Sequence, residues 1–117
     1  SSLTIDNCVF EENSALEGGA KGLYATRGTL KLNQTRFAKS QSVVLDGLVE
    51  ASIEKTIFED DLRISDGAKV QANMTEVAGV LAMSGTSSRN PTVDLVKCTI
   101  GKIENNPTTP ATLTIHD

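Results

Sequence analysis

An eight-residue pattern at Leu3–Phe10 recurs along the chain and limits what the chain can fold into. Each copy has apolar residues at its first, third and eighth positions and Thr or Cys at its sixth. The copies occupy residues 3–10, 30–37, 51–58, 70–77 and 93–100, with a shortened copy from Leu113 to Ile115. A repeat of about 19–27 residues that is rich in short β-type segments is typical of a solenoid of stacked coils.

Each copy reads as two short strands around a bend. Leu3 and Ile5 alternate with Thr4, as on a strand with one buried face, but Cys8 falls out of phase with Ile5. The backbone must therefore bend between them. We expect Asn33, Glu54 and Asn73 to form this corner, because Asn and Asp tolerate left-handed dihedral angles.

A second apolar group ending in Gly follows each copy, as in 23–28, 43–47, 62–67 and 80–85. Strand, corner, strand, turn, third strand and Gly turn make up one coil of a parallel β-helix. We predict one all-β domain over 1–117, a right-handed parallel β-helix of about five coils. The coils begin near Leu3, Leu30, Ala51, Val70 and Val93, with a partial coil from Leu113.

The main alternative fold is an all-β sandwich, which also has short, regularly spaced strands. A sandwich does not require aligned columns, whereas stacked coils about 4.8 Å apart do favour them. The predicted interior ladder is Cys8, Thr35, Thr56, Thr75 and Cys98. The predicted core column is Phe10, Phe37, Phe58, Val77 and Ile100. The columns favour the β-helix.

The composition narrows the classes of partner. The net charge is −4 and the eleven basic residues are scattered, which argues against a nucleic-acid partner. No apolar run approaches the roughly 20 residues of a membrane-spanning helix. The chain has three Phe, one Tyr and no Trp, which suits a narrow solenoid interior and leaves few rings for stacking on sugars.

The segment Phe10-Glu-Glu-Asn13, followed by Gly18-Gly-Ala20, resembles the repeat of polymorphic outer membrane proteins. These surface autotransporters are built on right-handed β-helices, and related repeats occur in other pectate-lyase-like surface proteins. The resemblance covers about the first 25 residues, and later copies lack both the Asn and the Gly-Gly-Ala. It implies a β-helix with an adhesive or structural role, at the cell surface or outside the cell.

The two cysteines are expected to be small interior residues rather than a disulfide. Cys8 and Cys98 share a column four coils apart, about 19 Å, which exceeds the reach of a disulfide. Asn33-Gln-Thr35 and Asn73-Met-Thr75 match the glycosylation acceptor pattern. Asn33 and Asn73 are therefore candidate acceptors, although ladder geometry alone can also place a Thr after each of them.

No residue pattern indicates a catalytic site, a metal site or a cofactor. Glu59, Asp60, Asp61 and Asp66 lack Ca²⁺-binding spacing, and Lys39 is expected to pair with Asp60 on a solvated face. His116 has no Ser or Cys partner suggested by spacing. The outward column of Thr4, Lys31, Ser52, Gln71, Asp94 and Thr114 holds one acid and one base, three coils apart. We therefore expect no enzyme activity.

We expect a structural or adhesive β-helix segment of an extracellular, cell-surface or fibre-forming protein. Two alternatives stay open: a non-catalytic remnant or part of a polysaccharide-acting enzyme, and a carbohydrate-binding module. The expected partners are adjoining coils of the same or an identical chain, and host or surface glycans. The first and last copies lack room for a cap, which predicts continuation into further coils and suggests a filament.

Overall fold

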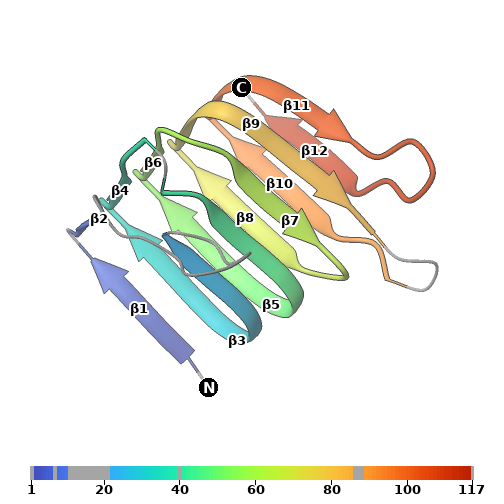
Figure 1. The fold of residues 1–117 in the computed structure, drawn as a ribbon, viewed down its shortest axis with the longest axis horizontal. Helices are drawn as coiled ribbons and strands as arrows, with labels where there is room; N and C mark the ends of the chain where they lie inside the picture. Colours follow the sequence, from blue (N-terminus) through green and yellow to red (C-terminus); the bar gives the residue numbers. More distant parts are fainter. Residues whose placement is uncertain (1, 7, 11–21, 40, 86–88, 117) are drawn as a thin grey trace.

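The computed structural model describes residues 2–6, 8–10, 22–39, 41–85 and 89–116 (Figure 1). It is built from strands and short turns, and the described residues contain no helix, hence none long and apolar enough to cross a membrane. The strands are β1 (Ser2–Asp6), β2 (Val9–Phe10), β3 (Leu23–Asn33), β4 (Arg36–Phe37), β5 (Val43–Glu54), β6 (Ile57–Phe58), β7 (Leu62–Ser65), β8 (Lys69–Asn73), β9 (Glu76–Ser84), β10 (Thr92–Val96), β11 (Thr99–Asn105) and β12 (Thr112–His116).

The strands stack in three faces, and every strand pair among the described residues is parallel. The first face contains β1, the end of β3, the end of β5, β8, β10 and β12. The second face contains β2, β4, β6 and the starts of β9 and β11. The third face contains the starts of β3 and β5, then β7 and the ends of β9 and β11.

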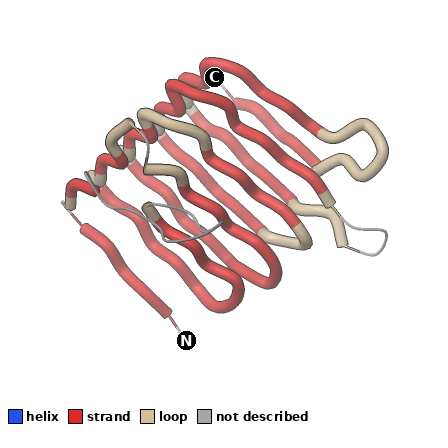
Figure 2. Tube along the Cα trace, in the orientation of Figure 1, coloured by secondary structure: helices blue, strands red, loops and turns tan. Residues whose placement is uncertain are grey.

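This arrangement is a parallel β-solenoid of about four turns, which confirms the all-β helical fold class (Figures 1 and 2). In the first face Leu3 pairs with Leu30, Leu30 with Ala51, Ala51 with Val70, Val70 with Val93, and Val93 with Leu113. These are the residues that open each copy of the repeat. The register of the first face has no shift from its first strand to its last.

The core lies between the three faces and follows the alternation within each strand. In β8 the inward residues Val70 and Ala72 are buried while Lys69, Gln71 and Asn73 are exposed. The rings of Phe37 and Phe58 stack with centroids 5.2 Å apart and planes inclined by 6°. Equivalent side chains of successive coils thus pack on one another, which fills a narrow interior with aliphatic residues and one pair of stacked rings.

The corner between the first and second faces is made by a residue in the left-handed conformation. These residues are Gln34, Lys55, Met74 and Lys97, with φ between 48° and 52°. The sequence-based expectation placed the corner conformation at Asn33, Glu54 and Asn73, and it was wrong by one residue. Those three residues are still the last of their strands, so the bend begins immediately after them.

Glycine bends join the third face to the first face of the next coil. Gly28 and Gly47 have φ of 105° and 100° and lie inside β3 and β5, which continue through the bend. A Cβ on Gly47 would lie 2.6 Å from the carbonyl oxygen of Thr26. At these two positions the Gly turn that was expected between separate strands is a bulge within one bent strand, because a residue with positive φ turns the chain without ending the pairing. Gly67, with φ of 86°, lies in a turn between β7 and β8, as expected.

Candidate binding surfaces

The corner column of Thr and Cys is a row of side chains that cap the corners. Thr35 Oγ1 donates to the carbonyl oxygen of Asn33 at 3.0 Å, and Thr56 Oγ1 donates to that of Glu54 at 2.9 Å. Thr75 Oγ1 donates to the carbonyl oxygen of Asn73 at 3.1 Å. All three Thr side chains are buried, so each hydroxyl satisfies its hydrogen bonding within its own corner.

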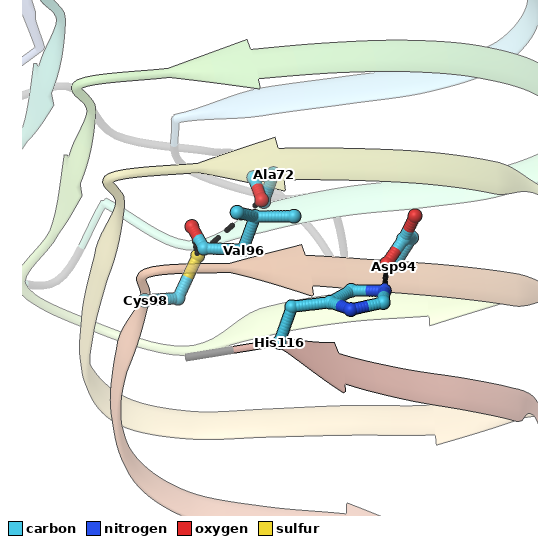
Figure 3. Close-up of polar contacts among 5 residues, drawn as sticks. All are labelled: Ala72, Asp94, Val96, Cys98 and His116. Atoms are coloured by element: carbon cyan, nitrogen blue, oxygen red, sulfur yellow. Dashed lines mark hydrogen bonds and ion pairs between the residues drawn. The ribbon is translucent and has the colours of Figure 1, made fainter.

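Cys98 makes the same contact with sulfur in place of oxygen. Its Sγ lies 3.4 Å from the carbonyl oxygens of both Val96 and Ala72 (Figure 3). A thiol is a weak donor, so this corner is held less strongly than a Thr corner. Cys98 is half-buried and its thiol is free.

Cys8 is exposed, which corrects its assignment to the interior. Its Sγ donates to the carbonyl oxygen of Asp6 at 3.2 Å, so the corner contact of the column is retained. In the part of the chain that the structure describes, the coil of Cys8 pairs with the coil of Thr35, whereas the buried Thr56 lies between two coils. The thiol of Cys8 is free.

The backbone ladder continues around each corner. The N–H of the left-handed residue donates to the next coil: Gln34 to Glu54 at 3.0 Å, and Lys55 to Asn73 at 3.0 Å. Two residues later the N–H donates to the previous coil, as Ile57 does to Thr35 at 2.9 Å. The corner therefore leaves no gap in the pairing between coils.

The predicted core column is buried in the middle of the solenoid. Phe37, Phe58 and Val77 are buried, whereas Ile100 is half-buried in β11. Phe10 pairs through its backbone with Phe37, but its side chain lies outside the described residues. The segment 11–21, which carries most of the Phe10–Asn13 and Gly18–Ala20 resemblance, also lies outside them.

The two candidate glycosylation residues differ in their surroundings. Asn33 is half-buried and its Nδ2 donates to Asp6 Oδ1 at 3.1 Å, whereas Asn73 is exposed. Asn106, which is followed by Pro, uses its side chain locally: Oδ1 accepts from the N–H groups of Thr108 at 2.9 Å and Thr109 at 3.2 Å. Asn73 therefore presents the more accessible amide of the two candidates.

The third face carries a shallow hollow of about 780 Å³ with an exposed ring at one end. Tyr24 is 54% exposed, and its hydroxyl lies 3.4 Å from Asp46 Oδ2. Ser65 Oγ donates to Asp46 Oδ1 at 3.0 Å, which holds the carboxylate in place. Arg63 also lines the hollow and is exposed. Sequence reasoning missed this group, although the only Tyr of the chain, at an outward strand position, was an available signal.

The acidic segment after β6 makes structural contacts. Glu59 forms an ion pair with Arg36, while the expected pairing of Lys39 with Asp60 is not among the ion pairs of the described residues. The hydrogen bond from Arg36 lowers the pKa of Glu59 below its usual value. Asp61 Oδ1 accepts from the N–H of Val80 at 2.9 Å. Within the described ranges no three His, Cys, Asp or Glu side chains gather as a metal site would require.

His116 is tied to the first face and has no nucleophile beside it in the contacts described. Its Nε2 lies 3.2 Å from Asp94 Oδ1, across the pairing of β12 with β10 (Figure 3). This contact fastens the last described strand to its neighbour.

The fold therefore defines the class of protein as a parallel β-solenoid repeat. Comparisons with protein-family models, with curated proteins and with solved structures find no match to the chain. The structure agrees with the β-helix part of the resemblance but does not point to a particular family.

Proposed function

We propose that the chain is a structural or adhesive β-solenoid segment of an extracellular, cell-surface or fibre-forming protein. One observation carries the proposal: the same corner contact recurs in every coil, from Cys8 through Thr56 to Cys98. Together with the unshifted register of the first face, it makes each coil a copy of the next. Such repetition supports a rod whose length is set by the number of coils.

The exposed inner-face side chains support a partner made of further coils. Leu3 is 50% exposed and Ile115 is 57% exposed, although both occupy columns that are buried in the middle of the solenoid. Coils of the same chain or of an identical chain fit these surfaces, because a parallel strand edge pairs with another strand. A filament of stacked units is the specific form of this proposal.

The polymorphic outer membrane protein-like resemblance supports the same location. Proteins of that kind display β-helices at the cell surface. The location is tested by treating intact cells that produce the protein with an impermeant protease and then detecting the chain by immunoblot. Loss of the chain while a cytoplasmic marker survives is expected. Full protection that ends only on lysis would overturn the location.

The rod itself is tested by electron microscopy of the source protein. We expect an elongated particle with the narrow cross-section of one coil, and an antibody against this chain should label the rod. A compact particle with no elongated region, or a label placed away from the rod, would contradict the structural role.

A carbohydrate-binding role is a second candidate, favoured by the hollow on the third face. Tyr24 offers a ring for stacking on a sugar, and Ser65 and Arg63, which also line the hollow, offer polar contacts. Asp46 does not line the hollow but lies beside the hydroxyl of Tyr24 and accepts from Ser65. The test is a glycan array probed with the chain and with Tyr24→Ala. Binding that is lost in Tyr24→Ala and retained in Ser52→Ala, on the first face, would support this role.

We propose no catalytic role and no cofactor. Incubating the chain with uronic-acid polymers, with and without Ca²⁺, should give no unsaturated product above the control without protein. Reproducible product that disappears in Asp61→Asn or Arg63→Gln would show that an active site had been misread as a solvated surface.

A further inference from the structure

The outer surface of the first face carries two straight rows of polar side chains. Row A contains Thr29, Glu50, Lys69, Thr92 and Thr112, which pair in this order from coil to coil. Row B contains Thr4, Lys31, Ser52, Gln71, Asp94 and Thr114. Between the rows lies a shallow hollow of about 520 Å³. The backbone strands beneath this surface are in regular register, so the spacing between the charged side chains is fixed.

The charges in these rows are arranged as a palindrome. Its centre lies between β5 and β8, with Glu50 on one side and Lys69 on the other, both in row A. One coil further out, Lys31 of row B lies on the first side and Asp94 of row B on the second. Each charge thus has an opposite charge at the same distance from the centre, in the same row.

We infer that this surface binds the same surface of a second copy about a two-fold axis, which is perpendicular to the stacking direction and runs parallel to the strands between β5 and β8. Rotation about that axis keeps the position along the strand and reverses the order of the coils. Glu50 then faces Lys69 of the second copy, and Lys31 faces Asp94 of the second copy. Each pairing occurs twice by symmetry, which is the pattern of an isologous interface.

The remaining positions of rows A and B agree with this arrangement, whereas in the neighbouring outward row Glu54 of one copy faces the neutral Asn73 of the other. Thr29 faces Thr92, Ser52 faces Gln71, and Thr4 faces Thr114, so neutral groups meet neutral groups. A third row begins at Asp6 and ends at His116, and the same rotation brings these two together. His116 and Asp94 already lie 3.2 Å apart, so the acidic and basic groups at this edge form a compact cluster.

Other registers of the same two surfaces are unfavourable. A slip of one coil places either Glu50 on Glu50 or Lys69 on Lys69 of the second copy. An axis along the solenoid instead places charged residues of one row against neutral residues of the other, for example Glu50 against Ser52. The charge pattern therefore selects one register both by attraction and by repulsion.

The size of the surface indicates a weak dimer. Strands of five residues at about 3.3 Å per residue, stacked over five spacings of about 4.8 Å, give roughly 400 Å² per copy. The total of roughly 800 Å² over the two copies is about half that of a standard specific interface, which is the range of weak and transient association. The inference uses only the outer surface of the first face and does not depend on the proposed structural or adhesive function.

The first experiment exchanges charges and measures association by sedimentation equilibrium. Glu50→Lys and Lys69→Glu each replace two attractive pairs by two repulsive ones, so each variant alone should dimerise at least about tenfold more weakly than the wild type. An equimolar mixture of the two should form a heterodimer as tight as the wild-type dimer. In that heterodimer the lysine introduced in one copy faces the glutamate introduced in the other, and the native Lys69 of the first copy faces the native Glu50 of the second.

The matched control is Arg63→Glu, which reverses a charge on an exposed strand of the third face and should leave dimerisation unchanged. Circular dichroism verifies that every variant keeps its β-structure. A wild type that stays monomeric up to about 1 mM, or variants whose mixture does not associate, would overturn the inference. Association that does not respond to these substitutions would do the same, because it would arise from another surface.

The second experiment detects the register directly, even if the strand edges also associate. In a background of Cys8→Ser and Cys98→Thr, Thr29→Cys and Thr92→Cys are prepared as separate proteins. Mild oxidation of their mixture should give a cross-linked heterodimer on a non-reducing gel, while either protein alone should not cross-link efficiently. Equal cross-linking of Thr29→Cys with itself would place the two copies in a different register and contradict the axis.

Discussion

The middle and the outermost coils of the solenoid carry the same sequence pattern in different environments. Ile53, in a middle coil, is 2% exposed, whereas Ile115 occupies the same column in β12 and is 57% exposed. Thr56 is buried, whereas Cys8, at the equivalent corner, is exposed. The repeat pattern is the same in both places, and among the described residues the number of neighbouring coils differs.

The comparison teaches that burial in this fold is a property of the stack. A single coil forms its corner contact by itself, as Cys8 does with Asp6, but cannot bury its apolar side chains. Nearest-neighbour contacts between coils therefore supply most of the stability. The same substitution should cost much in the middle and little at the ends, and the following predictions test that gradient.

The largest effect is expected from Phe37→Asp. The substitution removes a buried ring that stacks on Phe58 and buries an unpaired carboxylate, which together should cost more than about 5 kcal/mol. A loss of that size is comparable with the whole stability of a typical domain, so the chain should unfold. Circular dichroism and urea titration measure the outcome.

The matched control is Leu3→Asp, an acid placed in the half-exposed outermost coil, which should cost about 1 kcal/mol or less. If Leu3→Asp were as damaging as Phe37→Asp, the proposed gradient between the middle and the ends would be wrong.

A smaller effect is expected from Thr56→Val. Val keeps the shape of the side chain but loses the hydrogen bond to the carbonyl oxygen of Glu54, at a cost of about 1 kcal/mol. That carbonyl still accepts from the N–H of Gln34, which limits the loss. Cys8→Val should change stability by no more than about 0.5 kcal/mol. Both free energies of unfolding are measured by urea titration. Equal losses in the two variants would show that the stabilisation by the corner contact does not depend on neighbouring coils.

A third substitution separates local backbone strain from stacking. Lys55→Gly and Lys97→Gly both relieve a left-handed conformation, with φ of 49° and 52°. Relief of that strain outweighs the greater flexibility of Gly in the unfolded chain, so each should stabilise the protein by about 0.5 kcal/mol. The two gains, measured by urea unfolding, should be equal because the strain is local. A gain at only one of the corners would mean that neighbouring coils also determine the corner conformation.

The smallest effect concerns the exposed ion pair of Arg36 with Glu59. Because the folded-state pKa of Glu59 is lowered, its contribution to stability is present above its ordinary value of 4.5. That contribution is lost as the pH falls through the lowered folded-state pKa. In Arg36→Gln the pKa of Glu59 should rise toward its ordinary value, as followed by NMR titration. An unchanged pKa would show that Arg36 does not cause the shift.

The sequence predicts the architecture because the architecture repeats. Stacked coils require buried and exposed side chains to alternate along each strand, as they do in 70–72. They also require equivalent residues to align, as Thr35, Thr56 and Thr75 do. Corner conformation was predicted one residue too early, because unrelated residue types occupy the left-handed position. The expected pairing of Lys39 with Asp60 was not found and Arg36 pairs with Glu59 instead, because an ion pair depends on side-chain reach, which a column of aligned residues does not reveal.

The candidate surfaces were harder to predict than the fold. The group of Tyr24, Asp46 and Ser65 comes from three coils, and none of its residues belongs to the eight-residue pattern. The exposure of Cys8 was missed because a repeat pattern assigns the same environment to every copy. Both cases depend on which coils are neighbours, and this is set by tertiary structure.

The left-handed corners also have a consequence for how the sequence of this chain can change in evolution. Gln34, Lys55, Met74 and Lys97 are all exposed, and they are an amide, an amine, a thioether and an amine. Since the corner is held by the backbone and by the following Thr or Cys, the side chain at this position is free to drift. Successive positions lie about 4.8 Å apart along the solenoid. One edge of the molecule thus carries side chains at a fixed spacing. A substitution at one corner position changes the chemistry there without displacing the side chain at the next corner.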